Sequence, residues 1–150
     1  MIYFTHQFDV SLICDRLYQG SMPPTGGYLS KCGIDAVVLC AKENQNEILY
    51  KDVCVLCAPG DDDERFDRAE KFIEQVWLPV SLTVANLVKS GMTVLVTCIA
   101  GHNRSGAVTA LSLHHITGKS GRECVEIVRS RRHGSLSNET FVKIIEEMYP

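Results

Sequence analysis

Two stretches of the chain, residues 34–41 and 92–97, are almost continuously apolar and rich in β-branched side chains. Such runs are typical of strands that are buried on both faces of a sheet. Residues 53–58 have the same character and are followed by Pro59-Gly60, which closes the run. Residues 13–21 also have strand character and end in Gly20-Ser21. The pattern predicts a sheet of about four to five strands.

Between these runs, apolar residues recur at helical spacing. Residues 66–77 predict the start of a long helix, in which Pro79 should introduce a kink or a division. Further helices are expected from Pro23-Pro24 to about Gly33, over 104–116 and over 138–148, and a capping box at Ser120 and Glu123 starts one more. Because strands alternate with helices, we expect one α/β domain over residues 1–150, with a mostly parallel central sheet flanked by helices.

Composition narrows the class of protein. The 150 residues carry a net charge of −3, which argues against a nucleic-acid partner held by a bulk positive field. No apolar run reaches membrane-spanning length, and residues 1–7 lack the basic and apolar regions of a secretory leader. Seven cysteines without a leader suggest free thiols in a reducing compartment, so we expect a cytoplasmic or nuclear protein. Cys54 and Cys57 have CxxC spacing, but no second ligand pair completes a metal site, and no cofactor is expected.

The segment most informative about chemistry joins the strand at 92–97 to the helix that starts near Arg104. Successive N–H groups of a tight loop can surround one anion, and the helix N-terminus adds partial positive charge. Gly101 permits backbone angles that other residues resist, and the fork of Arg104 can bind two phosphate oxygens. The candidate phosphate-binding residues are Ile99, Ala100, Gly101, His102, Asn103 and Arg104.

Cys98 lies at the end of the strand, beneath this ring of donors. The N–H groups, the helix dipole and Arg104 would all stabilise its thiolate. A thiolate below a bound phosphate ester suggests nucleophilic attack, a phosphocysteine intermediate and hydrolysis by water. We therefore predict that Cys98 is the nucleophile and Arg104 the phosphate clamp, with the side chains of His102 and Asn103 at the pocket rim, facing the rest of the substrate.

Cys98 through Arg104 resembles the Cys-x5-Arg signature of the protein tyrosine phosphatase superfamily, and Ser105 matches the hydroxyl residue that follows the arginine. The short chain resembles the dual-specificity branch. Three flanking matches support this, namely Leu17-Tyr18-Gln19-Gly20-Ser21, Phe66-x2-Ala69-x2-Phe72-Ile73 and Asn138-x2-Phe141. The resemblance implies a protein tyrosine phosphatase-like fold and a phosphatase that acts on phosphotyrosine, and in addition on phosphoserine or phosphothreonine, in protein partners.

The resemblance also implies roles for individual residues. Ser105 would bond the sulfur of Cys98 and help the thiolate to leave. Asn138 would brace the loop, although a helix cap accounts for an asparagine there equally well. The family usually has histidine before the cysteine, where this chain has Thr97, whose hydroxyl can donate a weaker bond in its place.

The family takes the leaving-group proton from an aspartate on the loop ahead of the long helix. Asp61, Asp62 and Asp63 lie in the matching place. Distance from the preceding strand favours Asp61 or Asp62, and the alignment does not decide between them. Acidic residues at this point also suit a solvated turn and a helix cap.

Two other functions remain open. Gly101-x-Asn103-Arg104-Ser105-Gly106 resembles the loop of RNA 5′-phosphatases, and a phosphatase for another non-protein ester is a related alternative. A catalytically dead relative that only binds phosphorylated partners is the third reading, although both Cys98 and Arg104 are present. The sequence does not define the oligomeric state.

Two further features suggest interactions around the site. A basic run could dock a second phosphate or an acidic substrate, although such runs usually form a solvated face: Arg129, Arg131, Arg132 and His133. Cys40 and Cys57 each lie at the end of a predicted strand, where either could trap oxidised Cys98 as a disulfide. Both also suit small buried core residues.

Overall fold

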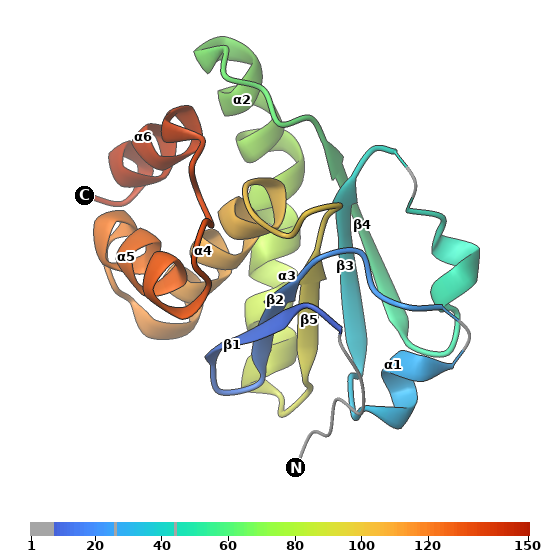
Figure 1. Cartoon of the computed structure of the whole chain (residues 1–150). Coiled ribbons are helices and arrows are strands. Elements are labelled where there is room, and N and C mark those ends of the chain that lie inside the picture. The colour runs from blue at the N-terminus through green and yellow to red at the C-terminus, as the bar shows by residue number, and fades with distance from the viewer. Residues whose placement is uncertain (1–7, 26, 44) are drawn as a thin grey trace.

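The computed structural model describes residues 8–25, 27–43 and 45–150. Its five-stranded sheet has the order β1-β2-β5-β3-β4, with strands β1 (Val10–Cys14), β2 (Leu17–Gly20), β3 (Ala36–Ala41), β4 (Cys54–Gly60) and β5 (Val94–Thr97). β1 pairs antiparallel with β2, whereas β2, β5, β3 and β4 pair in parallel. The predicted α/β fold with a mostly parallel sheet is confirmed (Figure 1). Residues 1–7, on which the expected lack of a leader depends, lie outside the described ranges.

Helices cover both faces of the sheet. They are α1 (Tyr28–Lys31), the 3-10 turn η1 (Glu47–Tyr50), α2 (Phe66–Phe72), the π-helical turn η2 (Ile73–Trp77), α3 (Leu78–Lys89), α4 (Arg104–Thr117), α5 (Gly121–Arg131) and α6 (Glu139–Met148). α3 to α6 lie on one side of the sheet and α1 on the other (Figure 1). The segments described contain no helix with the length and apolar character needed to cross a bilayer.

Alternation along the central strands produces two cores. In β3, Val38 and Cys40 face the helices α3 to α6, whereas Val37 and Leu39 face the core around α1. All six residues of β3 and all four of β5 are buried, as predicted for strands covered on both faces.

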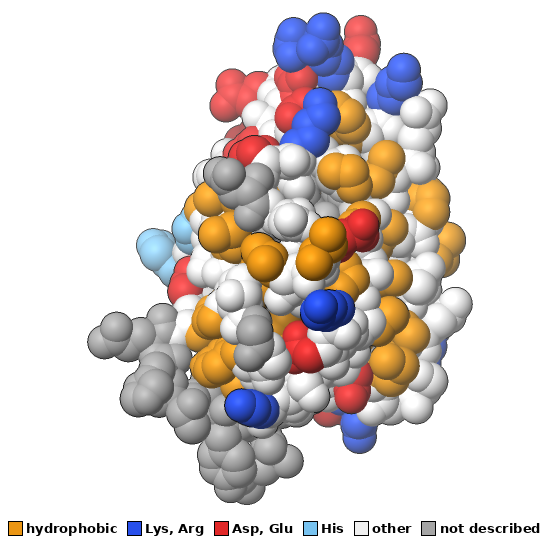
Figure 2. Space-filling view, turned by 90° about the vertical axis from the view of Figure 1, so that its right-hand side faces the viewer, with side chains coloured by type: hydrophobic (Ala, Val, Ile, Leu, Met, Phe, Trp, Pro, Cys, Tyr) orange, Lys and Arg blue, Asp and Glu red, His pale blue; other side chains and the backbone are white. Residues whose placement is uncertain are grey.

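The prediction that residues 53–58 form a doubly buried strand is wrong. β4 is an edge strand, because only β3 pairs with it, and its Cys54 and Cys57 are exposed. Figure 2 looks at this side of the molecule and shows hydrophobic side chains at the surface among charged ones. The thiol of Cys57 donates to Glu47 Oε2 at 3.2 Å.

The N-terminal segment also differs from its prediction. Residues 13–21 contribute to two strands, because the chain reverses at Asp15 and Arg16, where Arg16 adopts the left-handed φ of 63°. The helix expected from Pro23 begins only at Tyr28 and makes one turn. The reversal places β2 beside β5, so the end of β2 lies next to the loop that follows β5.

The long helix predicted from residue 66 continues through Pro79 to Lys89. The π-helical turn η2 lies directly before α3, which carries Pro79 near its start. Proline has no N–H to donate, and the wider π-helical turn accommodates this missing hydrogen bond. Trp77, in this turn, is fully buried and donates its indole N–H to Ala58 O at 2.9 Å. This bond ties the helix to β4 and so fixes both ends of the loop between β4 and α2.

Candidate active site

The β5–α4 loop, residues 98–103, connects the buried β5 to the start of α4. Cys98, at its base, is only 3% exposed. Gly101 has a left-handed φ of 72°, and a side chain there would collide with the backbone of Gly20 and Ser21 at the end of β2. Only glycine suits this position, as the sequence predicts, because it combines unusual backbone angles with close packing.

The carbonyls of the β5–α4 loop point outward, into hydrogen bonds with the surrounding protein. Ile99 O accepts from Met22 N at 3.1 Å, and His102 O accepts from Leu136 N at 3.2 Å. These bonds attach the two ends of the loop to the segments that follow β2 and α5.

The middle of the loop is held by Arg132, which follows α5. Its Nε donates to Gly101 O at 2.6 Å, and its Nη2 donates to Ala100 O at 3.3 Å. The guanidinium is in turn paired with Asp9, through Nη1 at 2.9 Å and Nη2 at 2.5 Å. This hydrogen bond from Arg132 lowers the pKa of Asp9. Gln19 Nε2 also donates to Gly101 O, at 3.0 Å.

These outward carbonyls determine where the loop N–H groups point. In a trans peptide the C=O of one residue and the N–H of the next point in opposite directions. With the carbonyls of residues 99–102 turned toward the protein, the N–H groups of residues 100–103 turn toward the concave side of the loop. Gly101 N–H accordingly donates to Cys98 Sγ at 3.2 Å. The loop therefore offers a nest of donors to an anion beside the sulfur.

Ser105 extends this arrangement from the first turn of α4. Its Oγ lies 3.4 Å from Cys98 Sγ, and it accepts from Gln19 Nε2 at 3.4 Å. Thr97 is not part of this network. Its hydroxyl donates to Val38 O at 2.8 Å and accepts from Gln45 Nε2 at 3.0 Å. Thr97 does not take the place of the histidine usual in the family, because its hydroxyl hydrogen bridges β5 to β3 instead.

Arg104 is the cation at the mouth of the β5–α4 loop, with a side chain 12% exposed. One nitrogen, Nη1, contacts Glu43 Oε1 at 2.8 Å and Gly60 O at 3.4 Å. The hydrogen bond from Arg104 lowers the pKa of Glu43. Because a guanidinium has five N–H donors, this pairing leaves others available for an oxyanion.

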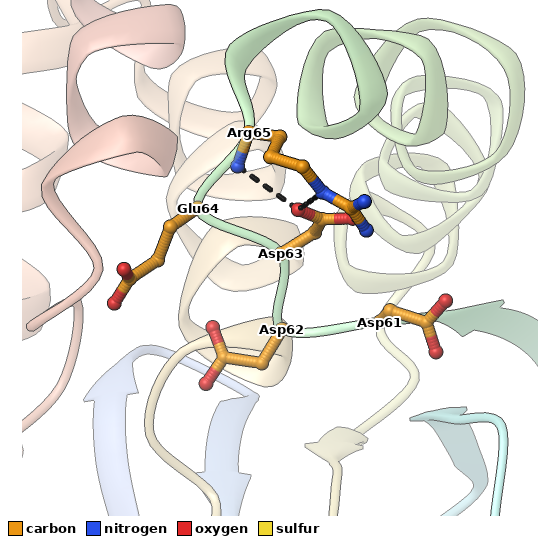
Figure 3. Close-up of a pocket in the computed structure, with 5 residues that line it drawn as sticks. All are labelled: Asp61, Asp62, Asp63, Glu64 and Arg65. Carbon is orange, nitrogen blue, oxygen red and sulfur yellow. Dashed lines mark hydrogen bonds and ion pairs between the residues drawn. The ribbon is translucent and has the colours of Figure 1, made fainter.

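The β4–α2 loop, residues 61–65, carries the three candidate acids in different surroundings (Figure 3). Asp63 accepts from Arg65 N and Nε at 2.9 Å and from Nη2 at 2.7 Å. The side-chain bond to Arg65, followed by the backbone bond, lowers the pKa of Asp63 to about 2. Asp61 points away from Asp62 in Figure 3, and its Oδ2 lies 3.5 Å from Lys42 Nζ at the surface.

Asp62 is the aspartate that connects to the β5–α4 loop. Its Oδ2 accepts from Asn103 Nδ2 at 2.9 Å, and its Oδ1 accepts from Asn138 Nδ2 at 2.8 Å. Asn103 Oδ1 accepts from Asn138 N at 2.9 Å and from Ser137 Oγ at 3.2 Å. The side chain of Asn103, expected to face the rest of a substrate, therefore joins the two loops.

Asn138 has both roles that the sequence left open. Its Oδ1 caps α6 by accepting from Thr140 N at 3.1 Å and Phe141 N at 3.4 Å. Its amide and backbone N–H meanwhile bind Asp62 and Asn103. The cap thus fixes the orientation in which the amide reaches the β4–α2 loop.

The family model "Dual specificity phosphatase, catalytic domain" matches residues 17–149. The chain belongs to this family. Membership of this family supports phosphatase activity in general and implies a phosphorylated substrate. Curated protein sequences gave no match.

Solved structures share the fold of this phosphatase domain. A mouse protein described as a dual specificity phosphatase, complexed with zinc tungstate, has 22% identity and a TM-score of 0.80 over 98% of this chain and 90% of its own. Human DUSP28 has 21% identity and a TM-score of 0.75, covering 93% and 92%. PTPMT1, solved in complex with PI(5)P, has 16% identity and a TM-score of 0.72, covering 92% of each chain.

One member of the basic run, Arg132, is not available to the docking surface considered from sequence. Arg132 is 5% exposed and bound to the β5–α4 loop and Asp9, so it cannot receive a second phosphate. Arg129 donates to Leu136 O at 2.6 Å and to Glu139 Oε1 at 2.7 Å. Arg132 therefore supports the site from behind.

The two candidate redox partners of Cys98 occupy different positions. The parallel register pairs Leu39 with Thr97, the last residue of β5, so Cys40 on β3 lies beside the point where Cys98 begins the β5–α4 loop. Burial, and next the charge of Cys98, raise the pKa of the Cys40 thiol well above its usual range. Cys57 lies one strand further away, on the exposed β4.

Two residues of the site were not identified from sequence. Glu43 follows β3 in a polar segment, and Gln19 is a polar residue within a strand; neither carries a local signal of its contacts with residues 101–105. The strand-end position of Glu43 offered the better clue, because carboxyl ends of parallel strands meet at one edge of the sheet.

Proposed function

We propose that this phosphatase domain hydrolyses phosphate monoesters through a phosphocysteine at Cys98, with phosphotyrosine proteins as its substrates. One observation carries the proposal. The carbonyls of residues 99–102 are bonded outward, so the N–H groups of residues 100–103 face the concave side of the loop, where that of Gly101 donates to Cys98 Sγ. Such a nest stabilises both a thiolate and the phosphate that it attacks.

In the first step, Cys98 Sγ forms a bond to phosphorus while the ester P–O bond breaks. Arg104 would bind two of the phosphate oxygens, in the bidentate geometry that its guanidinium favours. Its pairing with Glu43 through Nη1 holds the side chain across the loop mouth before substrate arrives. The negative charge of the transferring phosphoryl group is thus met by fixed donors.

The leaving oxygen needs a proton, and Asp62 is our choice for its donor. Asp62 touches the β5–α4 loop through Asn103, whereas Asp61 turns toward Lys42 at the surface. Asp63 is paired with Arg65, which lowers its pKa to about 2 and makes it a poorer proton donor. In the second step Asp62 would take a proton from the water that attacks phosphorus, and the S–P bond would break.

Ser105 would assist that second step. Its Oγ lies 3.4 Å from Cys98 Sγ, so its hydroxyl can donate to the sulfur as the thiolate leaves. Ile99, Ala100, Gly101, His102 and Asn103 would supply the backbone donors, with Asn138 in support.

The charge around the site favours protein substrates over polyanions. At the loop mouth Glu43 neutralises Arg104 and Asp62 binds Asn103, while residues 99–103 contain no lysine or arginine. RNA and polyphosphorylated inositol lipids would be repelled by this arrangement. The neighbour solved with PI(5)P nevertheless makes a lipid the control to include.

A substrate panel tests the proposal. Phosphotyrosine, phosphoserine and phosphothreonine peptides, a phosphatidylinositol phosphate and 5′-triphosphate RNA would be offered at equal concentration, and kcat/KM compared. We expect phosphotyrosine peptides to be the best substrates by at least about tenfold. A higher kcat/KM for the lipid or the RNA would contradict the assignment of substrate class.

A further inference from the structure

Gln19 is a polar side chain in an unusual place. It is fully buried in β2, on the same face of the strand as the core residue Leu17. Its Nε2 lies 3.0 Å from Gly101 O, 3.0 Å from Ser135 Oγ and 3.4 Å from Ser105 Oγ. A buried amide is costly unless it is bonded, so these contacts are what hold it in the interior.

The neighbours of Gln19 fix which way round its amide lies. Gly101 O can only accept a hydrogen bond, so the atom facing it must be the donating nitrogen. The same nitrogen then faces Ser105 Oγ, which therefore acts as acceptor on that side. When Cys98 is a thiolate, its sulfur can only accept, and the hydrogen of the Ser105 hydroxyl can then point toward Sγ, 3.4 Å away. The amide nitrogen has two hydrogens for three acceptors, so the longer bond to Ser105 Oγ shares a hydrogen with one of the shorter bonds.

The other end of the amide is not satisfied. Gln19 Oε1 is buried and finds no hydrogen-bond partner within the described ranges 8–25, 27–43 and 45–150. A buried acceptor of this kind lowers stability. The amide is thus a poor choice for packing alone, and its contacts all lead to the loop, to Ser105 and to Ser135.

We propose that Gln19 is a positioning residue of the active site, which acts through Gly101 and Ser105. This inference rests on the proposed roles of Cys98 and Ser105. By holding Gly101 O behind the loop, Gln19 keeps the N–H of His102 directed at the bound phosphate. By donating to Ser105 Oγ, it keeps the serine hydrogen on the sulfur. Gln19 thereby takes the supporting role that Thr97 does not fill.

The test uses Gln19→Met, which keeps an unbranched side chain of similar size and removes the donor. It is combined with Ser105→Ala in a double-mutant cycle. Ser112→Ala is the matched control, since Ser112 is also a buried serine of α4, but its Oγ donates to Val108 O within the helix. Two quantities are measured: the midpoint pH for alkylation of Cys98 by iodoacetamide, and the burst and steady-state rates with p-nitrophenyl phosphate.

Gln19→Met should raise the alkylation midpoint by about half a pH unit or more, because the Ser105 hydroxyl and the loop N–H groups are no longer held toward the thiolate. It should lower the steady-state rate by about tenfold, the effect of one hydrogen bond made to a charged group. A burst should precede the slow phase, because departure of the thiolate is the step affected. In the Ser105→Ala background the loss of rate should fall below about threefold. Ser112→Ala should behave as the unaltered protein.

Two outcomes would overturn the inference. A folded Gln19→Met protein whose alkylation midpoint moves by less than about 0.3 pH unit and whose rate stays within about twofold of the unaltered protein would show no positioning role. An equal loss of rate in both backgrounds would remove the path through Ser105. If Gln19→Met does not fold, as judged by urea unfolding, Gln19→Leu is measured in the same way against the same criteria. The alkylation arm requires no turnover, so it tests Gln19 even if the proposed phosphatase activity fails.

Discussion

The β5–α4 loop and the β4–α2 loop lie side by side, but they are held by different kinds of contact. The first is fixed from behind by buried groups, above all Arg132 and Gln19, which bind its carbonyls. The second is an exposed acidic segment, linked to the first through the carboxylate of Asp62 and the amides of Asn103 and Asn138. The loop that carries the nucleophile is thus held by buried hydrogen bonds, whereas the proposed acid is held by a few polar bonds near solvent. Substitutions in the two loops should therefore have effects of different size and kind.

The largest effect is expected at the phosphate clamp in the buried part of the site. Arg104→Lys keeps the charge but loses the planar fork, so kcat/KM should fall by about 10²–10³-fold, as when an anion-stabilising donor is removed. Steady-state kinetics on a phosphotyrosine peptide measures the loss. A variant that retains activity within about tenfold would show that bidentate binding by Arg104 is not required.

The acid loop should show an effect that depends on the leaving group. Asp62→Asn should slow hydrolysis of a tyrosyl or alkyl phosphate by about 10²-fold, because the leaving oxygen is then expelled without a proton. An ester with a very good leaving group needs little protonation and should be affected far less. Rates for a series of leaving groups measure the contrast.

Asp61→Asn is the matched control, since it alters the neighbouring carboxylate, which faces Lys42. It should change the rates uniformly and by little. If Asp61→Asn shows the leaving-group dependence and Asp62→Asn does not, our assignment of the acid is reversed.

A smaller effect is expected at Glu43, the exposed partner of Arg104. Glu43 is about half exposed, and exposed ion pairs contribute up to ~1 kcal/mol, which limits the effect of Glu43→Ala to about fivefold. We expect it to appear as a higher KM, because Arg104 is no longer held in place before binding. A fall in kcat of more than about tenfold would mean that Glu43 acts in the chemical step.

The last prediction concerns recovery from oxidation. Peroxide would oxidise the Cys98 thiolate to a sulfenic acid and be reduced to water, and the thiol of Cys40 would then displace water to form a disulfide. The bridge requires Cα atoms within about 7 Å, and Cys40 lies beside the end of β5, which Cys98 directly follows. We expect Cys40→Ser to lose most of the recovery that dithiol gives after peroxide, and Cys57→Ser to recover as the unaltered protein does.

Peptide mapping by mass spectrometry provides the decisive comparison. A Cys40–Cys98 linked peptide is expected in the oxidised protein. Full recovery of Cys40→Ser, with no such peptide in the unaltered protein, would leave the sulfenic acid as the reversible species.

How well each strand could be predicted depends on whether it lies in the centre of the sheet or at its edge. Residues 34–41 and 92–97 were assigned correctly because a strand buried on both faces needs an uninterrupted apolar run. Residues 53–58 have a similar run, but their strand lies at the sheet edge. Composition does not reveal how many neighbours a strand has, so burial of β4 was overestimated.

The residues of the site also differ in whether the sequence could predict them. Cys98, Gly101 and Arg104 are close in sequence, so their spacing alone predicts the loop. Gln19 reaches Gly101 across 82 residues, and a single polar residue in a strand gives no sign of such a contact. Arg132 looked like part of a solvated basic run, because sequence does not show that Asp9 and two carbonyls surround it.

The central claim is that Cys98 carries the phosphoryl group during turnover. Ser105→Ala should slow departure of the thiolate, so the intermediate should accumulate. This variant would be mixed with a phosphotyrosine substrate, quenched in acid within the first turnover and mapped by mass spectrometry, with Cys98→Ser as the control. We predict phosphate on Cys98, and neither covalent phosphate nor turnover in Cys98→Ser. Phosphate on another residue, or turnover by Cys98→Ser within about tenfold of the unaltered protein, would contradict the account.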